Sequence, residues 1–333
     1  MTDLFLGVDA GGTKTHAAVM DCDGNILGLG VAATGNWERV GLDASALALS
    51  KAVDGALGES GVHRRDISAA TFALAGIDWQ SDATVMQGVL DRFGFACTPT
   101  VMNDAYAVLY AGTVDGVGCA SIAGTGGKTV ARDGENVAAT LGMSLGEGGG
   151  AGQIVAEAMR ILAEMHHGQR PRTAMLAEIL TATGFSTAEE IFQAVARDGF
   201  DLSEAMAPLF FDLAATGDQA AVDVIEAVAL QHARDVAGIV SQLNFRDAPI
   251  SLVCAGGLHT AGSKLFNSAF QLAVAKSGYK FETSILQVVP VVGALIHAAN
   301  TAWAAGASSA RTKLFDDAFA RREDFRAAAQ WAS

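Results

Sequence analysis

Apolar residues in the first 33 positions gather in three short runs that are separated by turn residues. Residues 3–9 form the first run, which leads into a glycine turn, and residues 15–33 hold two more runs with Asp-Gly-Asn at 23–25 between them. Such a triplet between apolar runs is a strong hairpin signal. The pattern therefore predicts three consecutive strands, with a tight turn after each of the first two.

Helices and strands then alternate as far as residue 113. Residues 43–60 have helical periodicity, residues 68–76 form a buried strand that ends in glycine, and residues 81–94 form a second helix. Residues 98–113 predict a short strand that runs into a helix near Ala105. The resulting order is β-β-β-α-β-α-β-α.

The same plan begins again at residue 116. Residues 116–142 repeat the shape of residues 3–30: an apolar strand, a glycine-threonine-lysine turn, a short strand, a turn with glycine and asparagine, and another strand. A repeat of about one domain length predicts two duplicated α/β folds that face each other. We therefore divide the chain into domains 1–115 and 116–333.

Helices dominate the second domain after its first strands. Residues 153–245 are almost entirely amphipathic helix, and the longest helix in them begins with Asp218 as a capping residue. Residues 249–258 predict a buried strand that ends in two glycines, and an alanine-rich helix follows from about residue 293. The second domain therefore carries a large helical insertion.

Composition narrows the function classes. The 333 residues are 50% hydrophobic, which is enough for two domain cores, and the net charge of −14 disfavours nucleic acid or an anionic membrane as partner. The four cysteines have no zinc, iron–sulfur or disulfide spacing. The N-terminus has no signal-peptide pattern and no apolar run is long enough for a bilayer, so we expect a cytoplasmic protein.

The glycine run in residues 121–134 ends like a P-loop but does not match one. A P-loop needs glycine five residues before Gly-Lys-Ser/Thr, and counting back from Gly127 that position is Ile122. A P-loop also opens a helix, whereas residues 132–136 predict a hairpin turn. Since the matching turn at 11–13 occurs in the other domain, we interpret the two glycine loops as opposite jaws whose backbone N–H groups hold phosphate.

Six segments in a fixed order give the chain a family resemblance. In sequence order they are DAGGTKT (9–15), TGNW (34–37), LAGID (74–78), NDAYAVLYAG (103–112), AGTGGKT (123–129) and VCAGGL (253–258). The first, fourth, fifth and sixth resemble the phosphate 1, catalytic-aspartate, phosphate 2 and adenosine segments of the sugar kinase, Hsp70 and actin superfamily, and the resemblance covers nearly the whole chain. The sugar segment TGNW and LAGID are most similar to the N-acetylglucosamine kinase-like group of the BadF/BadG/BcrA/BcrD ATPase family.

The resemblance implies a fold, an activity and cofactors. It implies an α/β protein with two duplicated ribonuclease H-like (actin-like ATPase) domains around a cleft. The implied activity is phosphorylation of an amino sugar, N-acetylglucosamine or glucosamine, by ATP with Mg²⁺. A small-molecule sugar is then the partner, and a homodimer is an expectation taken from the family.

Two aspartates are the candidates for chemistry. Asp104 lies where a strand ends before a helix, and the resemblance makes it the base that accepts the proton of the sugar hydroxyl. The alternative is a helix cap, which either Asn103 or Asp104 could supply. Asp9 ends the first strand at a glycine turn, where an aspartate can hold Mg²⁺ through water; a turn-capping role is the alternative.

Two further groups of residues follow from the same motifs. Backbone N–H groups, the Thr13 hydroxyl and the Lys14 charge suit phosphate, and glycines after the last strand suit adenine, although each could also be an ordinary turn. Asparagine suits sugar hydroxyls because it both donates and accepts. The candidates for ATP are Gly11, Gly12, Thr13, Lys14, Gly124, Thr125, Gly126, Gly256 and Gly257. The candidates for the sugar are Asn36, Trp37, Gly76, Asp104, Thr125 and Glu147.

One loop departs from the family pattern. Relatives carry Gly-Asp-Glu-Gly-Ser and then an aromatic pair, whereas residues 145–155 read LGEGGGAGQIV, with Glu147 in place of the aspartate that helps to hold the sugar. The sequence therefore leaves open whether the substrate is N-acetylglucosamine, glucosamine, N-acetylmuramic acid or another hexose. It also leaves open a non-catalytic sugar sensor on this fold. An ATPase that drives a protein partner is disfavoured, because no cysteine occupies a cluster-binding glycine loop.

Overall fold

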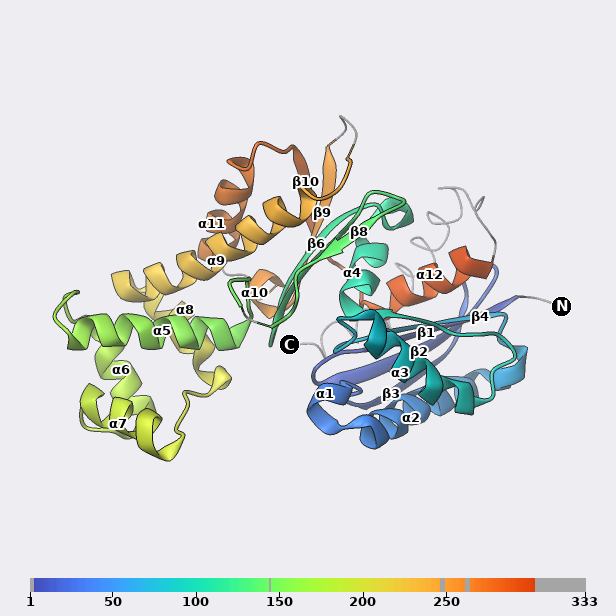
Figure 1. The fold of residues 1–333 in the computed structure, drawn as a ribbon, viewed down its shortest axis with the longest axis horizontal. Helices are drawn as coiled ribbons and strands as arrows, with labels where there is room; N and C mark the ends of the chain where they lie inside the picture. The colour runs from blue at the N-terminus through green and yellow to red at the C-terminus, as the bar shows by residue number, and fades with distance from the viewer. Residues whose placement is uncertain (1–2, 144, 246–248, 261–263, 303–333) are drawn as a thin grey trace.

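Two five-stranded sheets with the same internal order organise the chain (Figure 1). The structure is a computed structural model that describes residues 3–143, 145–245, 249–260 and 264–302. Each sheet consists of a three-stranded antiparallel meander that is extended by two parallel strands, in the orders β3-β2-β1-β4-β5 and β8-β7-β6-β9-β10. The predicted duplication of an α/β fold is therefore confirmed.

The first sheet follows the predicted strands closely. It contains β1 (Leu4–Ala10), β2 (Lys14–Asp21), β3 (Ile26–Ala33), β4 (Ala69–Leu74) and β5 (Thr100–Asn103). Its central strand β1 pairs antiparallel with β2 and parallel with β4, so the ends of β1, β4 and β5 meet at one edge. This edge is where Asp9 and Asn103 lie.

Helices cover both faces of the first sheet. One face is covered by α2 (Leu42–Ser60), and the two come so close that a Cβ at Gly30 would lie 1.9 Å from the carbonyl oxygen of Ala52. The other face is covered by α12 (Val291–Ala302), which packs on β1 and β4 and forms a core with Phe5, Met20 and other residues. The remaining helices are α1 (Trp37–Val40), α3 (Gln80–Leu90), α4 (Asp104–Gly112) and the 3₁₀ turns η1 (Arg64–Asp66), η2 (Asp91–Phe93) and η3 (Val114–Gly116).

The last described helix, α12, packs against the sheet formed by the beginning of the chain. The unit 116–333 drawn from the sequence ends, within the described residues, on the sheet of the first unit (Figure 1). The predicted alanine-rich tail corresponds to α12, and its continuation beyond residue 302 lies outside the described residues.

The second sheet carries the predicted helical insertion. Its strands are β6 (Gly118–Ala123), β7 (Gly127–Arg132), β8 (Val137–Ala139), β9 (Ile250–Ala255) and β10 (Phe281–Ile285). The helices are α5 (Ala151–His166), α6 (Ala174–Thr183), α7 (Ala188–Asp198), η4 (Glu204–Met206), α8 (Ala207–Ala215), α9 (Gln219–Val240), α10 (Gly257–Thr260) and α11 (Lys264–Ala275). They share one large core with the sheet.

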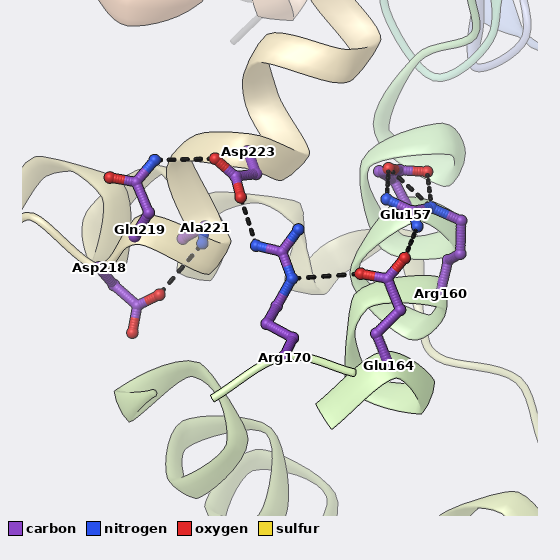
Figure 2. A network of polar contacts seen from close by, with 8 residues as sticks. All are labelled: Glu157, Arg160, Glu164, Arg170, Asp218, Gln219, Ala221 and Asp223. Atoms are coloured by element: carbon purple, nitrogen blue, oxygen red, sulfur yellow. Dashed lines mark hydrogen bonds and ion pairs between the residues drawn. The ribbon is translucent and has the colours of Figure 1, made fainter. Parts of the chain in front are cut away.

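A chain of alternating charges links α5 to α9 (Figure 2). Arg160 bonds both Glu157 and Glu164, Arg170 then bonds Glu164 at 3.1 Å, and it also pairs with Asp223. The start of α9 beside this chain is capped as predicted, because the Asp218 carboxylate accepts the N–H of Ala221 at 3.1 Å. Through Arg170 these contacts join the end of α5 to α9, and the first residues of α5 line the cleft described next. Within the described residues, no helix has the length and apolar character needed to cross a bilayer.

Candidate active site

A cleft of about 940 Å³ is lined by residues from both halves of the chain. The candidates that line it are Gly12, Asn36, Gly76, Asp104, Gly124, Thr125, Gly126 and Glu147. The tertiary structure thus brings together residues from both glycine loops, the proposed base Asp104, and three further sugar candidates, Asn36, Gly76 and Glu147. The candidates that do not line it are Asp9, Gly11, Thr13, Lys14, Trp37, Gly256 and Gly257.

Both glycine loops are hairpin turns. In the β1–β2 turn the Gly11 N–H donates to the Lys14 carbonyl at 3.0 Å, and in the β6–β7 turn the Gly124 N–H donates to the Gly126 carbonyl at 2.9 Å. Because a strand and not a helix follows the second loop, the rejection of a P-loop is confirmed. Gly256 has a φ of +89°, and a Cβ there would lie 2.5 Å from the Ala123 carbonyl, so the last glycine motif packs against the second loop.

Arg39 is a cleft residue that the sequence analysis missed. Its Nη1 donates to the carbonyl of Gly12 at 3.1 Å, and the exposed side chain lines the cleft beside the first glycine loop. A cation at this position suits phosphate or another anionic group. Its only signal in the sequence is its place two residues after Trp37, which did not distinguish it from a surface arginine.

Asp104 begins α4, but a different residue caps this helix. The Asn103 side chain accepts the N–H of Ala105 at 3.0 Å, so Asn103 is the cap and Asp104 is not needed for it. Burial raises the pKa of Asp104 to about 6, and the Asp78 carboxylate adds to the rise while Lys128 opposes it. A carboxyl group with this pKa changes its protonation state close to neutral pH, as a general base should.

Asp78 was not singled out from the sequence, although it ends the LAGID segment. Its Oδ1 accepts from Lys128 Nζ at 2.6 Å and from Asn103 Nδ2 at 3.1 Å. Lys128 comes from β7 of the second sheet, so this ion pair joins the two halves across the cleft. The pairing also fixes the cap Asn103, and through it the start of α4 that carries Asp104.

Asp9 lies at the end of β1 and is 9% exposed. Burial raises its pKa well above the ordinary value, and the charge of Asp104 raises it further, so the two carboxylates interact. A divalent cation would relieve this repulsion, and the pair therefore fits Mg²⁺. Within the described part of the chain, no three His, Cys, Asp or Glu side chains are grouped to hold a metal. Most ligands would then be water and phosphate oxygens, as Mg²⁺ prefers.

The sugar segment forms α1 and its entry. Asn36 is the cap of α1, accepting the Glu38 N–H at 3.0 Å, and it lines the cleft. The indole N–H of Trp37 donates to the Gly76 carbonyl at 2.6 Å, which ties this segment to the end of β4. Gly76 has a φ of +81°, and a Cβ there would meet Asn36 and Glu38 at about 3.0 Å. Trp37 therefore ties the sugar segment to the residues after β4 and does not line the cleft.

Glu147 is held by its own loop and is 8% exposed. Its carboxylate accepts the N–H groups of Gly142, at 2.9 Å, and Met143. Burial would raise the pKa of Glu147, but these N–H groups and that of Leu145 outweigh burial and lower it. The glycine-rich loop therefore does not simply expose the Glu147 side chain. A fixed, ionised carboxylate faces the cleft at this point.

These features define a class of protein: two duplicated α/β halves whose hairpin loops and buried Asp104 meet in one cleft, as in the actin-like ATPase fold. The chain belongs to the BadF/BadG/BcrA/BcrD ATPase family, whose model matches residues 6–298.

Three similar proteins are sugar kinases by name. An N-acetylmuramic acid/N-acetylglucosamine kinase of Clostridium acetobutylicum is 22% identical over 76% of this chain and 84% of its own length. An N-acetyl-D-glucosamine kinase of Dictyostelium discoideum is 24% identical over 65% of this chain and 73% of its own. The solved structure of a candidate N-acetylglucosamine kinase from Chromobacterium violaceum aligns with a TM-score of 0.65, at 18% identity, over 88% of this chain and 98% of that one.

Proposed function

We propose that this protein is a sugar kinase that transfers the terminal phosphoryl group of ATP to a hydroxyl of an amino sugar. The observation that carries the proposal is the position of Asp104. It combines a pKa of about 6 with a place in the same cleft as Asn36 and the glycine loop 124–126. Membership of an ATPase family and the named kinases among the relatives support the same activity.

The residues divide the work of phosphoryl transfer. Asp104 accepts the proton of the attacking hydroxyl at its carboxylate, which requires the ionised form. Asn36 and Glu147 orient the sugar, since an amide donates and accepts and a fixed carboxylate accepts from hydroxyls. The Gly11 and Gly124 N–H groups bond within their own turns, so the other backbone N–H groups of loops 11–13 and 124–126 hold the phosphates from both sides. Closure of the two halves would exclude water from the reacting groups.

Mg²⁺ is the cation that this site fits. Asp9 is the residue that would hold it, because its carboxylate is buried and the charge of Asp104 raises its pKa further. When bound, the ion would neutralise the negative charge of the nucleotide's phosphates.

Charge favours a neutral or cationic sugar over an acidic one. The acidic side chains that line the cleft outnumber the basic ones: Glu38, Asp78, Asp104, Glu147, Glu157 and Glu204 face Arg39, Lys128 and Arg160. A like-charged substrate is disfavoured in such a field. We therefore propose N-acetylglucosamine or glucosamine as the substrate and place N-acetylmuramic acid, which carries a carboxylate, behind them.

A substrate panel tests this function directly. Release of ADP from MgATP is measured with N-acetylglucosamine, glucosamine, N-acetylmuramic acid and glucose, and without sugar. We expect the first two to give the highest kcat/KM. If no sugar raises ADP release above the sugar-free rate, the kinase assignment is wrong; if N-acetylmuramic acid is the best substrate, the charge argument is wrong while the kinase assignment stands.

A further inference from the structure

We propose that Gln231, His232 and Asp235 of α9 are positioning residues that hold the glycine-rich loop 146–150 in the wall of the cleft. This inference rests on the proposed function, because the loop carries Glu147 and contacts the second phosphate loop. The three side chains do not line the cleft themselves. They act on the substrates only through the loop that they bind.

Each of these side chains bonds the backbone of the loop. The Gln231 amide donates to the Gly146 carbonyl at 2.7 Å, and it also donates to Asp235 at 3.1 Å. The Asp235 carboxylate accepts the Gly148 N–H at 2.5 Å. His232 Nε2 lies 2.7 Å from the Gly149 carbonyl. Three backbone groups of a four-residue stretch are therefore satisfied by one helix that lies about 85 residues further along the chain.

The surroundings of His232 determine which of its nitrogens carries the proton. A carbonyl oxygen only accepts, so the bond to Gly149 requires a hydrogen on Nε2. Burial lowers the pKa of His232 and so favours the neutral ring, in which Nδ1 accepts; the Ser121 hydroxyl of β6 lies 3.3 Å from it. His232 is fully buried. This imidazole is thus oriented from both sides, one partner being the loop and the other a strand of the second sheet.

The loop is packed closely between α9 on one side and the second phosphate loop on the other. A Cβ on Gly148 would lie 2.7 Å from the His232 ring, so the loop lies directly on α9. On its other side, a Cβ on Gly150 would lie 2.0 Å from the Gly124 carbonyl, and a Cβ on Gly127 would lie 1.9 Å from the Gly148 carbonyl. The glycines permit this double contact, and a shift of α9 side chains must therefore move the loop relative to Gly124.

The same loop contacts the second phosphate loop and carries a proposed sugar contact. The Ala151 N–H, at its end, donates to the Gly124 carbonyl at 2.9 Å, which joins it to the second phosphate loop. Glu147, at its start, is the proposed sugar contact. Groups that place two substrates must be held to within a fraction of an ångström, and the side chains behind them supply that support.

Paired variants separate the hydrogen bonds from mere filling of space. His232→Gln keeps an N–H donor of similar reach, whereas His232→Leu keeps volume and loses the donor. Asp235→Asn keeps an acceptor for Gly148, whereas Asp235→Ala does not. Arg234→Ala, an exposed change on the same helix, is the matched control. The measurements are kcat and KM for the sugar, the thermal midpoint, and hydrogen exchange of peptides that cover residues 145–153.

We expect His232→Leu and Asp235→Ala to raise the sugar KM about tenfold, because each leaves a buried backbone group unpaired. Exchange of the loop amides should accelerate in both variants, and the two conservative variants should stay within about threefold of the parent in KM. A lowered thermal midpoint with unchanged KM and unchanged loop exchange would overturn the proposal. If His232→Leu does not fold, the Asp235 pair decides in the same way.

The hydrogen-exchange measurement needs no sugar and so separates this inference from the proposed function. If the parent phosphorylates no sugar while loop exchange accelerates in Asp235→Ala, the kinase assignment is wrong, but the proposal that α9 holds loop 146–150 stands. If the parent is a kinase and the loop amides are equally protected in all variants, the proposal that α9 holds the loop is wrong, but the kinase assignment stands.

Discussion

Asp104→Asn tests the proposed base with two readouts that move in opposite directions. Asparagine keeps the shape and an acceptor oxygen but cannot take a proton. A general base contributes about 10²- to 10⁴-fold in rate, so turnover should fall by that factor. ATP affinity should stay nearly unchanged, because the glycine loops that we propose to hold the nucleotide are separate from α4.

The structure also predicts that this substitution stabilises the protein at neutral pH. The pKa of Asp104 rises from 3.8 to about 6 on folding, about two units, which corresponds to roughly 3 kcal/mol at 1.36 kcal/mol per unit. Because the folded-state pKa is raised, the neutral form is the favoured one. Ionisation of buried Asp104 therefore lowers the stability of the folded protein. This loss is absent below the unfolded pKa, grows as the pH rises from about 4 to about 6, and is complete above pH 6.

Calorimetry of the ligand-free protein measures this gain. Asp104→Asn should raise the thermal midpoint at pH 7.5, by about 2 to 4 °C for each kcal/mol in a domain of this size, and the gain should vanish near pH 4. Asp43→Asn is the control, since Asp43 is an exposed carboxylate in the first turn of α2. It should change neither turnover nor the midpoint appreciably.

Two results would refute the reasoning. A variant whose turnover stays within a few-fold of the parent would remove Asp104 from the mechanism. A variant that loses stability at pH 7.5 would show that Asp104 is needed structurally, against the finding that Asn103 caps the helix.

Three further predictions concern the surroundings of this residue. In the parent, the acidic limb of the pH profile of kcat/KM is expected near pH 6. Lys128→Met should move this limb to higher pH, because the lysine lowers the pKa of Asp104. A limb that stays in place or moves to lower pH contradicts this. Asn36→Asp keeps the cap of α1 but loses the amide donor, so the sugar KM should rise about tenfold while the ATP KM stays constant. Steady-state kinetics that show no change in the sugar KM would exclude a contact between Asn36 and the sugar. Removal of Mg²⁺ with EDTA should abolish ADP release, and Asp9→Asn should raise the Mg²⁺ concentration for half-maximal rate; a variant with the parent's Mg²⁺ dependence would place the ion elsewhere.

Local features of the fold could be predicted from the sequence because neighbouring residues determine them. The hairpin at 23–25, the helix at 43–60 and the cap Asp218 each depend on a few adjacent side chains and backbone groups. The duplication was visible for the same reason, since each copy repeats its own turns and strands. Strand β10 was missed because its residues are mostly exposed, and only its pairing with β9 makes it a strand.

The arrangement of the site depended on contacts that no local pattern contains. The choice of Asn103 over Asp104 as the cap left Asp104 available as a base, and the raised pKa came from burial and from Asp78, which lies in a different segment. The ion pair of Asp78 with Lys128 joins residues 50 positions apart, and α9 holds a loop that is more than 80 positions away. Motif residues could therefore be named from the sequence, whereas their protonation, their partners and the side chains behind them were decided by how the two halves pack, because desolvation and long-range hydrogen bonds exist only in the folded chain.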